Sequence, residues 1–307
     1  MRIVFFGSPD FAVPSLEALY SHHDVILVVT RTDKPAGRGK KVSPPPVKSF
    51  AQELGLKVIQ TDKISDDLIE AIVSLRPDLC VVNAFGLFLS KKLRKSSGNW
   101  CINVHPSMLP RYRGAAPIQR AIINGEKSTG VTIMHVAGKL DAGDIILQEE
   151  VPILYEDTAE TLSLRLAQKG AQLLVKAIEL LEQGTAPRIP QDEGLATWAE
   201  PLKKEDGRID WSWPAEKIRD LVRGVVPWPG AYTGLPDGRT LKVWPHVEVR
   251  DGIYGMPGTV LEVKPEVIVA AGRGGVLLGD VQLPGKKRVP AKALVNGGVI
   301  VKGDRFA

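Results

Sequence analysis

Residues 2–7 read Arg-Ile-Val-Phe-Phe-Gly, and residues 25–30 read Val-Ile-Leu-Val-Val-Thr. Both runs are mainly apolar and rich in β-branched side chains, which is typical of strands buried on both faces. A Gly-Ser-Pro turn closes the first run, and apolar residues at helical spacing occupy residues 10–20. Strand, glycine turn, helix and strand in this order predict the opening of a doubly wound, mostly parallel α/β sheet of Rossmann-like type.

The same alternation continues through the first part of the chain. Residues 79–84 and 131–136 predict two further strands, and residues 158–184 predict an amphipathic helix. The stretch after this helix contains prolines and no sustained hydrophobic period. We therefore expect an N-terminal α/β domain over residues 1–188 and a linker over residues 189–205.

The pattern changes from residue 206 onward. One helix is expected at residues 215–223, and short strand-like runs then alternate with Gly/Pro turns. The runs cover residues 240–244, 259–263, 267–271, 276–278 and 299–302. Short strands between such turns predict a small, OB-like β-barrel domain over residues 206–307.

The composition is that of a globular protein of two domains. The chain has 307 residues, of which 44% are hydrophobic and 24% charged. No apolar run approaches the ~20 residues that a membrane-spanning helix needs, and the N-terminus has no signal-peptide pattern. The two cysteines, Cys80 and Cys101, lie in apolar runs and are expected to be small core residues. These features indicate a cytoplasmic protein without a membrane segment.

Positive charge is concentrated in two places. Residues 201–307 carry 17 Lys and Arg against 12 Asp and Glu, which accounts for the whole net charge of +5. Residues 31–48 hold six basic residues, one acid, four prolines and two glycines, and predict a long exposed loop. Arg38, Lys40 and Lys41 in this loop are suited to contact phosphates. A basic but non-binding surface and a solvated flexible loop are the alternatives.

Residues 101–120 carry the chemically distinctive side chains. Asn103 and His105 are two apart near the end of an expected strand, so they point to the same side. An amide can stabilise a developing oxyanion, and an imidazole can transfer a proton. Asp141 follows the strand at 131–136 in a Gly-containing loop, and it is expected to converge with these two residues at one edge of the sheet.

Other uses of these residues are less well supported by the sequence. The remaining histidines show no metal-ligand spacing with His105, so no metal is expected. Ser107 lacks the Gly-x-Ser-x-Gly pattern of an acyl-enzyme nucleophile, which favours direct group transfer. The apolar loop at residues 85–90 either lines a pocket for a flat ring or packs in the core.

Asn103-x-His105-x-Ser107-x-Leu109-Pro110-x-Tyr112-Arg113-Gly114, followed by Leu140-Asp141-Ala142-Gly143-Asp144, resembles the signature of the folate-dependent formyltransferases. The resemblance covers nearly the whole chain. The opening Phe6-Gly7-Ser8-Pro9-Asp10-Phe11, the loop Pro35–Lys41 and the run Gly285-Lys286-Lys287-Arg288 are similar to those members that formylate methionyl-tRNA.

The resemblance implies transfer of a formyl group from 10-formyltetrahydrofolate to the free α-amine of methionyl initiator tRNA, for translation initiation. It implies a catalytic set of Asn103, His105 and Asp141. It implies folate contacts from Ser107, Met108, Leu109 and Pro110, with the loop Phe85, Gly86, Leu87, Phe88 and Leu89. It implies tRNA contacts from Arg38, Lys40, Lys41, Lys286, Lys287 and Arg288. A monomer without a metal is expected.

Some positions depart from the pattern of the family, and two alternatives remain open. Met108 stands where leucine is usual, and Asn83-Ala84-Phe85 replaces the more usual Val-Ala-Tyr. One alternative is a formyltransferase acting on a small amine, such as glycinamide ribotide or an aminosugar nucleotide. The other is a tRNA-binding module without activity, which would have no need of Asp141.

Overall fold

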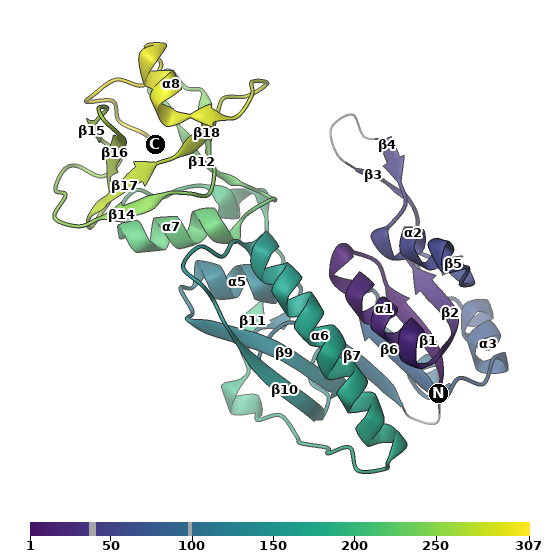
Figure 1. Cartoon of the computed structure of the whole chain (residues 1–307). Helices are drawn as coiled ribbons and strands as arrows, with labels where there is room; N and C mark the ends of the chain where they lie inside the picture. Colours follow the sequence, from purple (N-terminus) through teal and green to yellow (C-terminus); the bar gives the residue numbers. More distant parts are fainter. Residues whose placement is uncertain (37–40, 98–99) are drawn as a thin grey trace. The chain divides into compact units, whose positions relative to one another are not determined.

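A computed structural model describes residues 1–36, 41–97 and 100–307 of the chain (Figure 1). The chain forms two compact units. Unit 1 comprises Met1–Gly114, Thr129–Val151 and Ser163–Trp198, and unit 2 comprises Ala115–Ser128, Pro152–Leu162 and Ala199–Ala307. This division does not test the domain boundaries expected from the sequence, which stay a prediction.

A seven-stranded sheet forms the centre of unit 1, in the spatial order β10-β9-β7-β6-β1-β2-β5. Its strands are β1 (Arg2–Gly7), β2 (Asp24–Thr30), β5 (Val58–Gln60), β6 (Leu79–Asn83), β7 (Cys101–His105), β9 (Ser128–His135) and β10 (Ile145–Pro152). The pairs β1·β2, β2·β5, β1·β6 and β6·β7 are parallel, whereas β7·β9 is antiparallel. The predicted mostly parallel α/β sheet is therefore confirmed.

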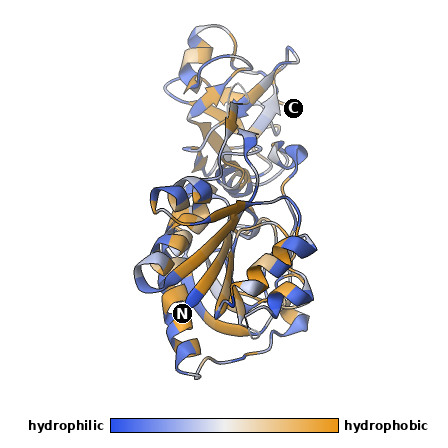
Figure 2. Ribbon diagram, turned by 90° about the vertical axis from the view of Figure 1, so that its right-hand side faces the viewer, coloured by the Kyte–Doolittle hydropathy of each residue, from blue (hydrophilic) through white to orange (hydrophobic). Residues whose placement is uncertain are grey.

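Helices lie on both sides of this sheet, whose strands are orange in Figure 2 because they are apolar. The helices of this part of the chain are α1 (Val13–His22), α2 (Pro46–Glu53), α3 (Asp66–Ser74), α4 (Lys91–Arg94) and α6 (Ala159–Glu182), with 3-10 turns η1 (Asp10–Ala12) and η2 (Glu193–Leu195). Ser65 caps α3 by accepting a hydrogen bond from the Leu68 N–H. Because helices cover both faces of the sheet, side chains on both sides of each strand are buried, and the strands read as continuous apolar runs.

The strand order reverses beside β1. The chain passes from β1 to β2 and β5 on one side, and then returns to place β6 and β7 on the other side. In open α/β sheets, the crevice at such a reversal, at the carboxyl ends of the strands, is the usual ligand site. The fold therefore predicts a binding site after β1, β2 and β6.

Some short strands lie outside the seven-stranded sheet. β3 (Lys34–Ala36) and β4 (Lys41–Ser43) pair antiparallel within the stretch that was predicted to be a long loop. β8 (Arg113–Gly114) ends where the chain first passes from unit 1 to unit 2, and β11 (Trp198–Ala199) spans its last passage.

Unit 2 contains two antiparallel sheets of four strands each, in the orders β12-β13-β18-β19 and β14-β17-β16-β15. The strands are β12 (Ala231–Gly234), β13 (Thr240–Val243), β14 (Glu248–Arg250), β15 (Val260–Glu262), β16 (Val267–Ala270), β17 (Gly275–Leu278), β18 (Asp280–Gln282) and β19 (Val289–Pro290). The helices are α5 (Pro117–Ile123), α7 (Ala215–Gly224) and α8 (Ala291–Asn296), with the 3-10 turn η3 (Lys204–Gly207). This confirms the predicted C-terminal region of short strands that follows one helix, and the strands pair antiparallel.

The expected strand at residues 299–302 is wrong. These residues form a turn after α8, where the N–H of Val299 donates to the carbonyl of Leu294 at 2.9 Å. The buried Ile300 packs in the core of unit 2, so its apolar character reflects core packing rather than strand pairing.

A buried charge cluster links α7 to the segment before α6 within unit 2. Asp220 accepts hydrogen bonds from Arg219 at 2.7 Å and from Arg223 at 2.8 Å. Arg223 also donates to the backbone carbonyls of Leu154, Tyr155 and Asp157, at 3.0, 2.9 and 2.8 Å. The buried charges are paired and hydrogen-bonded, as burial of a charge requires.

Candidate functional site

Asn103 and His105 lie on β7, near the middle of the sheet of unit 1. β7 runs parallel to β6, so His105 stands at the same edge as the carboxyl ends of β1, β2 and β6. The spacing of two places both side chains on one side of the strand. Asn103 is partly exposed, and its amide has no hydrogen-bond partner among the residues that the structure describes. This amide is therefore available to a ligand.

The ring of His105 is buried and held from two sides. Its Nε2 lies 3.0 Å from the backbone carbonyl of Tyr112, and its Nδ1 lies 3.7 Å from Oδ2 of Asp141. A carbonyl only accepts hydrogen bonds, so we infer that Nε2 carries a proton in either charge state of the ring. Nδ1, facing the carboxylate, is consequently the nitrogen that can gain or lose a proton.

Asp141 comes from the loop between β9 and β10, and its side chain is only 11% exposed. Its Oδ2 accepts a hydrogen bond from the N–H of Gly114 at 2.9 Å, in addition to facing His105. The backbone of Asp141 is left-handed, with φ of 48°, a conformation uncommon for residues other than glycine. The predicted convergence of His105 and Asp141 is confirmed by their contact.

The loop that carries Asp141 is packed tightly at Gly143. A Cβ at this glycine would lie 1.7 Å from the backbone oxygen of His135, so any side chain here would displace the loop. The N–H of His135 also donates to the carbonyl of Asp144 at 2.9 Å. Gly143 is therefore required by close backbone approach, and the loop returns to the sheet at a fixed point.

The turn after β7 is a hydrogen-bonded unit. The hydroxyl of Ser107 donates to the carbonyl of Arg111 at 2.7 Å, and Thr132 donates to the carbonyl of Ser107 at 2.6 Å. Leu109 is buried, and its carbonyl accepts a hydrogen bond from Gln148 at 2.8 Å. Met108 and Pro110 of the same turn are partly exposed. The predicted folate turn therefore presents Met108 and Pro110, while Ser107 and Leu109 hold its shape.

The loop Phe85–Leu89 divides between core and surface. Phe85 and Leu89 are each 2% exposed and belong to a core cluster, with Phe85 packed edge to face on Phe6 at a centroid distance of 5.4 Å. Leu87 packs against the same cluster. Phe88 is 57% exposed and carries the Arg94 guanidinium over its ring. Gly86 has φ of 76°, which turns the chain between these groups.

A hollow of about 530 Å³ lies at the strand-order reversal of unit 1. Its walls come from the residues after β1, β2 and β6 and from the start of α2, namely Ser8, Arg31, Thr32, Pro44–Pro46 and Ala84–Gly86, with Lys34 and Ser43. Arg31 is tied to Asp62 at 2.8 Å. This hollow is where the topology predicts a ligand, and it lies along the same sheet edge as His105.

The basic residues predicted to contact tRNA are described only in part. Arg38 and Lys40 lie outside the described residues, and of Lys41 only the backbone, paired with Ala36 in β3·β4, is described. Lys286 and Lys287 are exposed in the turn between β18 and β19. Arg288 pairs with Asp280 at 2.8 Å and lies over the Trp244 ring at 4.9 Å.

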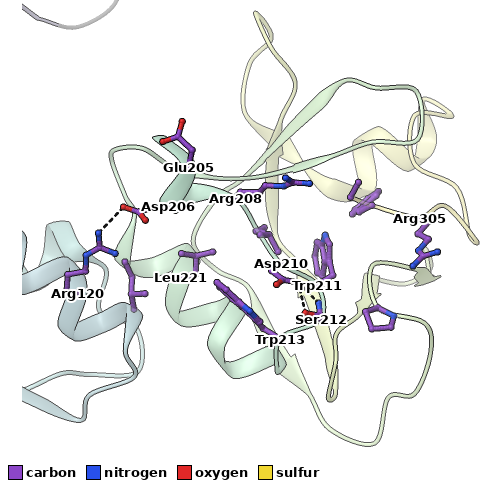
Figure 3. Close-up of a pocket in the computed structure, with 15 residues that line it drawn as sticks. Arg120, Glu205, Asp206, Arg208, Asp210, Trp211, Ser212, Trp213, Leu221 and Arg305 are labelled. Carbon is purple, nitrogen blue, oxygen red and sulfur yellow. Dashed lines mark hydrogen bonds and ion pairs between the residues drawn. The ribbon is translucent and has the colours of Figure 1, made fainter. Parts of the chain in front are cut away.

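Unit 2 has a separate hollow of about 800 Å³, shown in Figure 3. Trp211 and Trp213 line it, with Arg208 and Arg305 among its charged residues. The dashed contacts in Figure 3 are the Arg120–Asp206 ion pair at 2.9 Å and the hydrogen bonds between Asp210 and Ser212. The Trp211 ring is buried, and its N–H donates to Thr233.

Neither a metal-binding group nor a membrane-spanning helix is found within the described ranges. Over residues 1–36, 41–97 and 100–307, no group of three or more His, Cys, Asp and Glu side chains is placed to hold a metal ion. No helix in those ranges is long and apolar enough to span a membrane. Cys80 and Cys101 are free and buried as predicted, and burial raises the pKa of both thiols.

Two residues that hold the Asp141 loop and the turn after β7 were not expected from the sequence. Gln191, in the segment predicted to be a linker, donates to the carbonyls of Asp141 and Gly143. Thr197, from the same segment, accepts a hydrogen bond from the N–H of Tyr112 at 2.8 Å. No periodicity or motif marks either residue, because long-range hydrogen bonds leave no local pattern in the sequence.

Two family models match the chain. The model described as "Formyl transferase" matches residues 1–178, and the model described as "Formyl transferase, C-terminal domain" matches residues 201–298. Among curated relatives, the methionyl-tRNA formyltransferase of Moorella thermoacetica is 50% identical over 99% of this chain and 98% of the relative. That of Pelotomaculum thermopropionicum is 46% identical over 99% and 97%.

Solved structures share the fold at low sequence identity. An N-formyltransferase from Helicobacter canadensis, solved with folinic acid and dTDP-3-aminofucose, is 20% identical with a TM-score of 0.69, over 91% of this chain and 98% of that chain. HypX from Aquifex aeolicus, solved with tetrahydrofolic acid, is 20% identical with a TM-score of 0.63, over 97% of this chain and 47% of that chain.

Proposed function

The chain belongs to the formyl transferase family, and on that premise we propose that it transfers a formyl group from 10-formyltetrahydrofolate to the α-amine of methionyl initiator tRNA. The product, N-formylmethionyl-tRNA, serves translation initiation. The observation that carries the proposal is the His105–Asp141 contact, together with Asn103 on the same strand, whose amide has no hydrogen-bond partner among the described residues. The full-length similarity to methionyl-tRNA formyltransferases supports the choice of acceptor.

The reaction is a direct transfer between two nitrogens. The neutral amine attacks the formyl carbon, a C–N bond forms, and the carbonyl electron pair moves to oxygen. Collapse of this tetrahedral intermediate breaks the bond to N10 of the folate, which takes up a proton while the attacking amine loses one. The acceptor amine is suited to this because α-amino groups have pKa values of about 8 and are partly neutral at physiological pH.

Asn103 stabilises the oxyanion in this mechanism. Its amide N–H groups have no partner among the described residues, and they project from a strand whose neighbours fix its backbone. A donor held ready for the charge that develops in the transition state lowers the barrier without reorganisation.

His105 and Asp141 handle the protons. The Tyr112 carbonyl fixes the ring of His105 through Nε2, which directs Nδ1 toward Asp141. The Gly114 N–H holds the Asp141 carboxylate in place. A proton leaving the attacking amine can pass to this pair and on to N10 of the leaving folate.

We assign the folate to the turn Ser107–Pro110 and the loop Phe85–Leu89. Met108 in the turn and Phe88 in the loop are exposed enough to contact a flat ring. The buried Phe85 and Leu89 anchor the loop in the core. We assign the tRNA backbone to the basic loop that holds Arg38, Lys40 and Lys41, and to the Lys286–Arg288 turn of unit 2. The exposure of Lys286 and Lys287 supports the second assignment.

Acceptance of a charged tRNA would place the reaction in the cytoplasm, and we expect the chain to act as a monomer. Light scattering after gel filtration, at the concentration used in the assay, tests the oligomeric state. A stable dimer would contradict the expectation of a monomer without affecting the chemistry.

The deciding experiment measures transfer of radiolabelled formyl from 10-formyltetrahydrofolate to charged initiator tRNA. Elongator methionyl-tRNA, glycinamide ribotide and an aminosugar nucleotide are assayed in parallel. Label on the initiator tRNA alone is expected. Label on a small amine alone would keep the chemistry and refute the acceptor, and label on none of them would refute the enzyme.

A further inference from the structure

The side chain of Gln191 joins three parts of unit 1. Its amide nitrogen donates to the carbonyls of Asp141 and Gly143, at 2.9 and 2.8 Å. Its amide oxygen accepts from Nε and an Nη of Arg113, at 3.0 and 2.8 Å. Both N–H groups and both lone pairs are therefore used, so the amide is fully satisfied.

The orientation of this amide is set by Arg113. The Arg113 side chain is 2% exposed, and it also forms a two-point pair with Glu193, with contacts of 2.9 and 3.2 Å. A guanidinium only donates hydrogen bonds, so the oxygen of Gln191 must face it and the NH₂ group must face the Asp141 loop. The same guanidinium hydrogen bond lowers the pKa of Glu193, which keeps this partner ionised.

The Asp141 loop needs such a tie because of the direction of β9. Ile102 pairs with His135 and His105 pairs with Thr132, so β9 runs away from the end of β7 that carries His105. The loop therefore begins about three residues, or ~10 Å, below His105 along the sheet, and it must run back to reach it. Asp141 does so with a left-handed backbone, which has to be held by its surroundings.

We propose that Gln191 is the positioning residue of the Asp141 loop, holding the carboxylate against His105 through the backbone on either side of Ala142. Gln191 touches none of the reacting atoms. It acts on the orientation of Asp141, and Arg113 and Glu193 act on the orientation of Gln191. This inference rests on the proposed formyl transfer for its effect on rate, and on the hydrogen bonds alone for its effect on the loop.

The sharpest variant is Gln191→Glu, which keeps size and the acceptor for Arg113 but replaces the donor with oxygen. We expect kcat to fall about 10- to 100-fold, because misplacement of a reacting group by ~1 Å costs that much. KM for both substrates should stay within about twofold, since Gln191 is not assigned to binding. Gln191→Met, of similar length and without either polar group, provides a second test if Gln191→Glu folds poorly. The exposed Gln183→Glu is the matched control and should keep full activity.

A double-mutant cycle distinguishes positioning from a general structural role. In the Asp141→Asn background, where the carboxylate is already removed, Gln191→Glu should reduce kcat by less than twofold further. An equal reduction of kcat in both backgrounds would overturn the proposal, and so would full activity of Gln191→Glu.

Hydrogen exchange separates this inference from the proposed function. Gln191→Glu should speed exchange of the amides in residues 137–144 by at least tenfold, with β1 and β6 unchanged. If the unaltered protein transfers no formyl group, the proposed function fails while this readout still decides the role of Gln191. Unchanged exchange in the loop would then refute it.

Discussion

His135 should make the stability of unit 1 sensitive to acid. Its side chain is buried, and both ring nitrogens lack a hydrogen-bond partner among the described residues. Burial and, to a smaller extent, the charge of Arg188 lower its pKa to about 4, and Asp144 offsets part of their effect. The unfolded chain binds the proton near pH 6.5, whereas the folded chain resists it until about pH 4. Stability is therefore fully present above pH 6.5 and is lost as the pH falls toward 4.

The size of this effect follows from the two pKa values. At pH 8 the ring is neutral in both states, and His135 favours neither of them. At pH 5 the unfolded state is mostly protonated at this residue and the folded state is not. The folded state is then disfavoured by about 30-fold, or about 2 kcal/mol, relative to pH 8.

Hydrogen exchange on β9 measures this change directly, because the strand carries His135 and is flanked in the sheet by β10 and β7. After correction for intrinsic exchange rates, the opening free energy of β9 should fall about 2 kcal/mol more in the unaltered protein than in His135→Leu between pH 8 and pH 5. The exposed His22→Leu is the matched control and should behave like the unaltered protein. Equal losses in the unaltered protein and His135→Leu would show that His135 is not buried as a neutral ring.

Three other variants test the site and the basic surface. Asn103→Ala should lower kcat by ~10² or more with an unchanged circular dichroism spectrum, and normal turnover would remove Asn103 from oxyanion stabilisation. Gly143→Ala should abolish most activity, because its Cβ would overlap the oxygen of His135; single-turnover rates measure this, and an active variant would mean that the loop has another path. Replacing Lys286 and Lys287 with serine should reduce the slope of log Kd for tRNA against log salt by about 0.9 for each phosphate that is no longer neutralised, and an unchanged slope would remove the turn from the tRNA surface.

The sequence predicted the parts of the fold that depend on local pattern. The run at residues 2–7 became β1 with the same bounds, and the helix predicted over 158–184 became α6, Ala159–Glu182. Both contain a strong period and clear stop signals, so little else competes with them. The run at 299–302 failed because apolar residues in a tight turn can pack into a core as well as those in a strand.

The sequence points to the residues of the candidate site, but it does not point to the groups that support them. Asn103 and His105 follow from spacing on one strand, and Asp141 follows from the family resemblance and its Gly-rich loop. The carbonyl of Tyr112 and the amide of Gly114 are backbone groups, whose partners depend on tertiary structure and not on side-chain identity. Gln191 lies 50 residues after Asp141, in a stretch whose prolines predict only a linker.

The antiparallel direction of β9 explains why these supports are needed. In a fully parallel sheet the loop after each strand starts at the edge where the ligand binds, and a short loop delivers its side chain there. The loop after β9 starts at the opposite level of the sheet, opposite Ile102, and Asp141 must be brought back to His105. Gly143 fixes where the loop returns to the sheet, and Gln191 ties down the part that carries Asp141. The rate of formyl transfer should therefore depend on the long-range hydrogen bonds that hold the loop as much as on the carboxylate of Asp141 itself.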